Sequence, residues 1–233
     1  MFYIDIYYIV LVVPAIILSI IAQSMVQSRF KKYSKVFSRK GMTGEDTANL
    51  LLMKNGISDV SVGQIRGSLT DNFNPKTKAI SLSEPVYSSS SIAAIGVAAH
   101  ETGHAIQHHT GYIAIKIRNA VLPVAQLGSN AAVPLAILGF IFGAPVLVNA
   151  GILLFSAVVL FQVVTLPVEF NASRRAALLL KETGVLSEEE LGGAKKVLAA
   201  AALTYVASML TSLMSLLRLI LLSRNRSRGD ILH

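Results

Sequence analysis

Residues 97–106 read VAAHETGHAI, and this stretch decides what kind of structure surrounds it. His100 and His104 stand four positions apart, which places both imidazoles on one face of a helix, one turn apart, within reach of the same zinc ion. Glu101 follows the first histidine, so its carboxylate is directed towards the water of that ion. The surrounding alanines and glycines allow close packing against another backbone. The alternative, a surface helix with scattered polar residues, gives little reason for this pattern.

A catalytic zinc site needs a third protein ligand and an open position. Residues 108–109 are also histidines, but His108 lies a further turn beyond His104, and both suit the C-terminal dipole of the helix. Glu169 is the better candidate, because it follows an apolar segment that brings the chain back towards the same side. The alternative for Glu169 is an interfacial carboxylate paired with an arginine of residues 174–175.

The composition is that of a membrane protein. Apolar residues make up 53% of the 233 residues and charged residues 15%, against about 25% in soluble domains. The mean hydropathy is +0.58. The net charge of +8 comes largely from basic clusters that follow apolar segments, which is typical of membrane anchoring and not of nucleic-acid binding. The absence of cysteine excludes disulfides, cysteine-ligated zinc and a cysteine nucleophile.

Four apolar segments approach the ~20 residues that a bilayer core requires. They are Ile4–Ala22, Val121–Gly143 (interrupted by Pro134 and Gly139), Val146–Leu166 (ended by Pro167) and Val197–Leu222. The second could instead be a buried core helix or a re-entrant segment. The first has its basic cluster behind it, as an uncleaved anchor does. The second and third predict a tight hairpin, which returns the chain to the side it left.

The hairpin places residues 24–118 and 169–196 on one side of the membrane. Both regions are rich in lysine and arginine, so the positive-inside rule predicts the cytoplasm. The arginines at 224, 226 and 228 do not fit, because a fourth span would put them outside. Within 24–118 the sequence predicts a helix over Thr43–Asn55 and strands at Val60–Ile65 and Ala79–Leu82. Ser187 is placed to cap a later helix.

The last apolar segment carries a stripe of small polar residues at spacings of three and four, from Thr204 to Arg218. One interpretation is close packing of helices through small polar side chains. The other is that Tyr205 and its neighbours line an active-site cleft.

Three stretches, Leu69–Gln107, Gln162–Ser173 and Ala200–Ala207, together resemble the prokaryotic membrane neutral zinc metallopeptidases, the YugP-like family. The resemblance covers nearly the whole chain. It implies a peptidase with His100, His104 and Glu169 as zinc ligands and Glu101 as the catalytic acid and base. The layout is more loosely similar to the heat-shock and prenyl-protein-processing membrane gluzincins. Those place an Asp four residues after the ligand Glu, where this chain has Ser173, with Asn171 as the alternative partner for a ligand histidine.

The expected fold is mainly α: an integral membrane zincin-like protein with about four transmembrane helices and a small α+β cytoplasmic part that carries the zinc helix. The expected parts are an anchor (1–23), the cytoplasmic zincin-like region (24–118), a transmembrane hairpin (119–168), a cytoplasmic helix with the third ligand (169–196), and a membrane helix with a basic tail (197–233).

Zincins hold a peptide substrate by adding it to an edge strand beside the metal helix. Residues Thr70–Leu82 predict a strand, a turn at Asn74-Pro75 and a second strand. The edge role is assigned to Ala79, Ile80, Ser81 and Leu82, with an ordinary structural hairpin as the alternative, and Asn72–Asn74 receives no role. Tyr205 is a further candidate for substrate or oxyanion contact.

The sequence thus favours a zinc endopeptidase at the cytoplasmic face of a prokaryotic plasma membrane. Its partners would be a peptide or protein substrate and the lipid bilayer, with a regulatory or scaffold partner in the membrane left open. The first alternative is a membrane scaffold or adaptor with a structural zinc site, for which Glu101 would have no use. The second is a small transporter or channel, whose spans would need more ionisable residues than these contain.

Overall fold

The structure is a computed structural model that describes residues 5–229. The chain divides into two compact units, each built from separated stretches of sequence. The first unit comprises Met1–Ala22, Lys116–Leu166 and Thr204–His233, and the second comprises Gln23–Ile115 and Pro167–Leu203. The second unit contains the helix that carries His100 and His104, together with the sheet.

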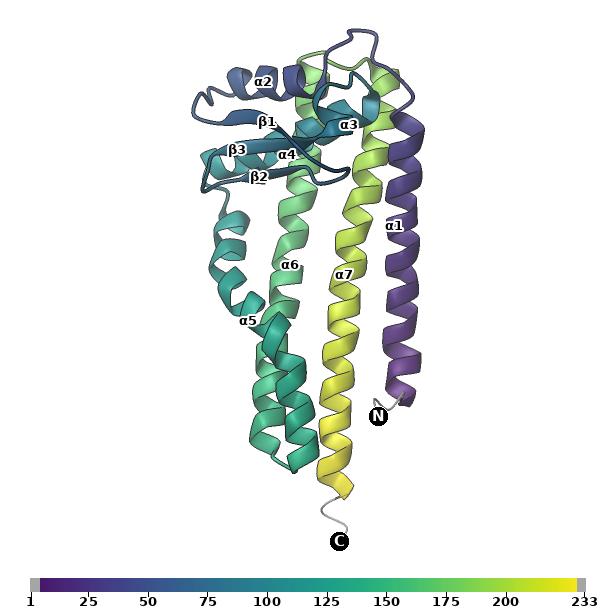
Figure 1. The fold of residues 1–233 in the computed structure, drawn as a ribbon, viewed down its shortest axis with the longest axis vertical. Helices are drawn as coiled ribbons and strands as arrows, with labels where there is room; N and C mark the ends of the chain where they lie inside the picture. The colour runs from purple at the N-terminus through teal and green to yellow at the C-terminus, as the bar shows by residue number, and fades with distance from the viewer. Residues whose placement is uncertain (1–4, 230–233) are drawn as a thin grey trace. The chain divides into compact units, whose positions relative to one another are not determined.

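Long helices dominate the chain. Within residues 5–229, four helices are long and apolar enough to cross a membrane, as the sequence predicts. They are α1 (Val13–Tyr33, preceded by the π-helical turn Tyr8–Val12), α5 (Ile113–Phe142), α6 (Pro145–Glu182) and α7 (Glu188–Gly229) (Figure 1).

Two of these helices continue through prolines. Pro134 lies inside α5, and Pro167 lies inside α6. The expectations that Pro134 interrupts the second apolar segment and that Pro167 ends the third are therefore wrong. A proline removes one backbone hydrogen bond, but helix packing and nearby hydroxyl groups compensate in membrane helices. Glu169 consequently lies on the same continuous helix as the third apolar segment.

The helices of the first unit pack through small residues. Gly143 turns the chain between α5 and α6 with a φ of +62°. A Cβ at Gly151 would lie 2.7 Å from the carbonyl oxygen of Ala132. Only a glycine permits this approach, so the predicted helical hairpin is confirmed.

Polar side chains join α1 to α7 in the same unit. The hydroxyl groups of Ser19 and Thr211 are 3.1 Å apart, and Arg218 forms an ion pair with Asp5 at 2.6 Å. Thr211 and Arg218 belong to the polar stripe of α7. These contacts favour the interpretation of that stripe as a helix-packing surface.

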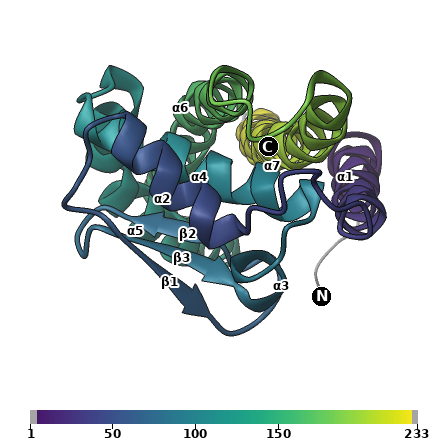
Figure 2. The same ribbon diagram turned by 90° about the horizontal axis from the view of Figure 1, so that it is seen from above.

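The second unit carries the shorter elements. They are α2 (Gly44–Lys54), β1 (Ser61–Ile65), β2 (Asn72–Asn74), β3 (Ala79–Ser83), α3 (Glu84–Tyr87) and α4 (Ile92–His109). Thr43 caps α2 in a capping box with Asp46, as expected for a helix that starts there. Figure 2 shows α2 lying across α4, with the strands alongside. Buried side chains of α2, β3 and α4, including Leu51, Ile80 and Ile95, form the core between them.

In the part of the chain that the structure describes, the strands form one sheet in the order β1-β3-β2. β1 pairs with β3 in parallel, Ser61 opposite Ala79. β2 pairs with β3 in antiparallel fashion, Phe73 opposite Ile80. The strand–turn–strand hairpin is confirmed, but Ala79–Leu82 lies in the central strand. The edge role assigned to Ala79, Ile80, Ser81 and Leu82 is therefore wrong, because β1 and β2 already flank that strand.

Candidate metal centre

The candidate metal centre is built on α4, which belongs to the second unit. Ser91 caps its first turn by accepting a hydrogen bond from the amide of Ala94 at 3.2 Å. Its N-terminal half is buried in the apolar core. At Gly103 a Cβ would lie 2.8 Å from the carbonyl oxygen of Ala172, so α4 and α6 meet there backbone to backbone. This close approach brings Glu169 of α6 to the histidines of α4.

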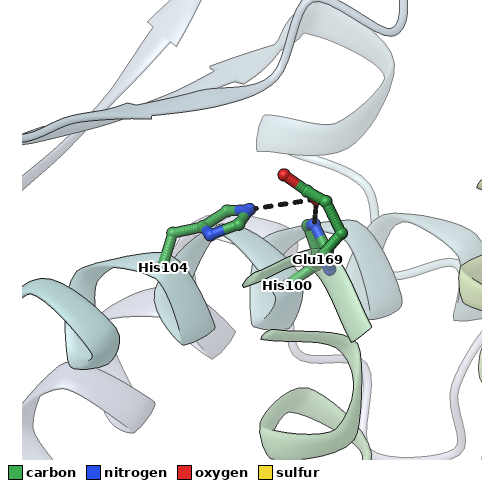
Figure 3. A group of neighbouring side chains, drawn as sticks. All are labelled: His100, His104 and Glu169. Atoms are coloured by element: carbon green, nitrogen blue, oxygen red, sulfur yellow. Dashed lines mark ion pairs between the residues drawn. The ribbon is translucent and has the colours of Figure 1, made fainter. Parts of the chain in front are cut away.

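His100, His104 and Glu169 form one cluster (Figure 3). The Nε2 atom of His100 lies 3.3 Å from Oε2 of Glu169, and the Nε2 atom of His104 lies 3.4 Å from the same oxygen. The two imidazole rings are nearly perpendicular, at 85°. All three side chains are largely buried, with 12% of each histidine and 4% of the glutamate exposed. The structure thus brings together the three side chains that the sequence proposes as ligands.

These distances fit a shared metal ion. Two ligand atoms at about 2.1 Å from a tetrahedral zinc are about 3.4 Å apart. A charge-assisted hydrogen bond from imidazole to carboxylate would be shorter, at about 2.7–2.9 Å. Within residues 5–229, Oε2 of Glu169 is buried and has no hydrogen-bond partner. A buried carboxylate oxygen without a donor is costly unless a cation completes its surroundings. The donor set of two imidazoles and one carboxylate suits zinc.

Glu101 lies next to the cluster and is 8% exposed. Burial raises the pKa of its carboxyl group, although His104 and His100 oppose that shift, and Glu169 adds to it. Burial tends to lower the pKa of the His104 imidazole, but the carboxylates of Glu169 and Glu101 raise that pKa overall. The cluster therefore favours bound positive charge, as either a proton or a metal ion.

Each ligand histidine has a partner at its second ring nitrogen. Nδ1 of His100 lies 3.1 Å from the hydroxyl oxygen of Ser173, and Nδ1 of His104 lies 3.0 Å from Oε1 of Gln107. In both rings Nε2 is the atom that faces Glu169. Of the two partners considered from the sequence, Ser173 contacts a ligand directly, whereas Asn171 contacts Gln107. Such contacts fix the orientation of a metal-binding ring.

Gln107 is the residue that the sequence reasoning missed. It is fully buried, at 0% exposed, near the C-terminal end of α4. Its position three residues after His104 was the available signal, because residues three apart on a helix are neighbours.

The remaining candidates lie outside the cluster. His108 and His109 end α4, as predicted. His108 packs edge-to-face against Phe73 of β2, with ring centroids 5.9 Å apart, and both line a cavity of about 210 Å³ that also borders Asp59 and Lys78. Tyr205 belongs to the first unit, so its role in the site stays a prediction.

Comparison with known proteins agrees with this chemistry. The family described as "Putative neutral zinc metallopeptidase" matches residues 8–224. The chain is also similar to the "Putative membrane protease YugP" of Bacillus subtilis (strain 168), with 47% identity over 218 residues, which cover 94% of this chain and 97% of that protein. No solved structure matches the chain. The match to the family over nearly the full length of the chain, together with two histidines and a glutamate that could hold a metal ion, places this protein in the neutral zinc metallopeptidase family.

Proposed function

We propose that this protein is a zinc-dependent endopeptidase of a prokaryotic plasma membrane, with its active site on the cytoplasmic side. The observation that carries the proposal is the convergence of His100, His104 and Glu169 beside the buried carboxyl group of Glu101. Among residues 5–229 this cluster supplies three protein ligands, which leaves a position open, as in catalytic zinc sites. A structural zinc site would be closed by a fourth ligand.

The roles of the side chains follow from their positions. His100, His104 and Glu169 would hold the ion, which supplies a Lewis acid and lowers the pKa of a bound water to near 7. Glu101 would accept the proton from the attacking water and deliver it to the leaving amine of the substrate. Burial of Glu101 keeps bulk water from its carboxyl group and suits it to both steps.

The outer edge of β2 is the proposed binding site for the substrate backbone. β2 ends the sheet, so its second edge is unpaired within the described residues. An extended peptide that pairs with Asn72–Asn74 would form a fourth strand. The cavity beside Phe73 and His108 would then receive a substrate side chain. This proposal gives the substrate-binding role to β2 in place of Ala79–Leu82, which lies in the central strand.

Phe73→Ala tests this site. We expect a higher KM and altered cleavage preference with unchanged zinc content, because the wall of the cavity is lost. Ile65→Ala on the opposite edge strand, β1, is the control and should change neither quantity. Equal effects of the two substitutions would contradict substrate binding at β2.

Glu101→Gln tests the proposed function in purified, zinc-loaded protein. Cleavage of an unstructured protein substrate should fall by roughly 10²–10⁴-fold, the usual contribution of a positioned acid and base. Zinc content should stay unchanged because Glu101 is not a ligand. The control is Glu84→Gln, an exposed glutamate of α3 in the same unit. Unchanged cleavage by Glu101→Gln would refute the proposal, and zinc binding without any turnover by the wild type would favour a scaffold.

A further inference from the structure

A chain of hydrogen bonds connects Arg175 of α6 to the ligand His104. Nε of Arg175 donates to Oδ1 of Asn171 at 2.8 Å. The same oxygen accepts a hydrogen bond from Nε2 of Gln107 at 3.0 Å. Nε2 of Gln107 also donates to the carbonyl oxygen of Val168 at 2.8 Å. Oε1 of Gln107 then lies 3.0 Å from Nδ1 of His104. All of these residues belong to the second unit.

The chemistry of these side chains fixes which atoms donate and which accept along this series of hydrogen bonds. A guanidinium group can only donate, so the atom of Asn171 that faces Arg175 must be the oxygen. The amide nitrogen of Gln107 then faces two acceptors, Oδ1 of Asn171 and the carbonyl oxygen of Val168, and supplies both of its hydrogens. Flipping the Gln107 amide would place its oxygen against those two acceptors. Oε1 of Gln107 must therefore face His104 as an acceptor.

We infer that Gln107 is a positioning residue that sets the tautomer of His104, and that Arg175 and Asn171 fix its orientation. This inference rests on the proposed zinc site. The carboxylate of Glu169, 3.4 Å from Nε2, competes for the proton of neutral His104 when no cation is bound, but with a cation in the cluster the acceptor at Nδ1 places that proton on Nδ1. The lone pair of Nε2, the atom 3.4 Å from Glu169, is then available to a metal ion. Because Gln107 also binds the carbonyl oxygen of Val168, it ties this ring to the residue that precedes Glu169.

His100 lacks such a fixed partner. Its neighbour, the hydroxyl group of Ser173, can donate or accept, so it does not dictate a tautomer. The two ligands from α4 thus differ, and His104 is the one whose state is imposed by buried groups. Gln107 is fully buried, so water cannot substitute for its amide.

Zinc affinity is the first readout, measured on the full-length protein in detergent by competition with a chromophoric chelator. Gln107→Leu keeps the approximate volume of the side chain but removes the acceptor, and we expect zinc to bind roughly 10- to 100-fold more weakly. Asn171→Leu should weaken zinc binding in the same direction. Asn171→Asp should stay within about threefold of the wild type, because a carboxylate accepts from both neighbours. Gln64→Leu, the same change at an exposed position of β1, should have no effect.

The second readout separates positioning from loss of structure. The zinc-free, ¹⁵N-histidine-labelled protein carries Glu169→Ala, which removes the competing carboxylate. At a pH at which the ¹⁵N shifts show that His104 is neutral, NMR reports which of its ring nitrogens carries the proton. The His104→Gln variant identifies the signals. In this background we expect the proton on Nδ1 when Gln107 is present, with or without Asn171→Asp, and a mixture of tautomers when Gln107→Leu is added.

A proton on Nε2 of His104 in the Glu169→Ala protein would overturn the inference, as would a Gln107→Leu protein that binds zinc like the wild type. Failure of the wild type to bind zinc would instead count against the proposed function. The tautomer measurement on the zinc-free protein keeps these two failures distinguishable.

Discussion

At the scale of single residues, Asp71 is a partly buried carboxylate whose charge contributes to raising the pKa of Glu101. It accepts hydrogen bonds from the amide of Ser83 at 2.7 Å and from the hydroxyl group of Ser83 at 3.0 Å. Burial nevertheless raises the pKa of Asp71 above its ordinary value of 3.8, against the lowering effect of Ser83. The folded protein therefore binds this proton more tightly than the unfolded chain does. The contribution of Asp71 to stability is greatest below pH 3.8 and declines as the pH rises through the raised value.

Asp71→Asn tests the direction of this pH dependence of stability. Asparagine can still accept from Ser83 but does not titrate. We expect the free energy of unfolding of the wild type, relative to the variant, to fall as the pH is raised from about 4 towards neutrality. Urea unfolding followed by circular dichroism at several pH values measures the difference. A difference that rises with pH would mean that the carboxylate is stabilised in the fold, and would contradict the argument.

The residues of the site differ in how far the sequence reveals them. His100, Glu101 and His104 are local in sequence, and helix periodicity alone places them together. Glu169 needed the additional argument that a hairpin returns the chain. Gln107 could not be assigned, because its role depends on which atoms of α6 face α4. That packing is set by the approach at Gly103 and not by any local pattern.

At the scale of elements, the contact between α4 and α6 sets the distance between Glu169 and the two histidines. A methyl group at Gly103 would lie 2.8 Å from the carbonyl oxygen of Ala172, which is backbone and cannot rotate away. We expect Gly103→Ala to destabilise the protein by about 1–3 kcal/mol, typical of overpacking. Zinc affinity should fall too, because Glu169 would be displaced from the histidines. Thermal unfolding and chelator competition measure both effects.

Gly192→Ala in α7 is the matched control for that substitution. No atom lies within 4 Å of a Cβ placed there, and the backbone is helical. We expect about 0.5–1 kcal/mol of stabilisation from the better helix propensity of alanine, with zinc affinity unchanged. Equal effects of the two substitutions would show that propensity, and not the close approach, governs Gly103.

The elements themselves were only partly predictable. α2 and α4 follow from their caps and apolar faces, which are local signals. The order of the strands was not predictable from local patterns. β1 pairs with β3, so Ser61 lies opposite Ala79, 18 residues later, although β2 stands between the two strands in the sequence. The prolines misled the prediction of helix ends because their effect depends on the surrounding helices.

At the scale of the whole molecule, zinc should couple the site to global stability. A ligand that binds the folded state at 1,000 times its Kd adds about 4 kcal/mol. We expect a strong chelator to lower the melting temperature and added zinc to restore it. Glu169→Gln should lose this response, whereas His108→Ala, a histidine outside the cluster, should keep it. A zinc response that survives in Glu169→Gln would place the metal elsewhere.

The side of the membrane on which the proposed site lies can be tested by labelling single introduced cysteines. The chain contains no cysteine, so a single introduced cysteine is a unique label. Basic residues in 24–118 and 169–196 favour the cytoplasm for the region that carries α4. We expect Ser68→Cys, at an exposed position between β1 and β2, to resist a membrane-impermeant maleimide in intact cells and to react after lysis. Ala144→Cys, in the turn between α5 and α6, should react in intact cells. The opposite labelling pattern would place the active site outside the cytoplasm, and labelling of both positions from one side would contradict α5 and α6 as a spanning hairpin.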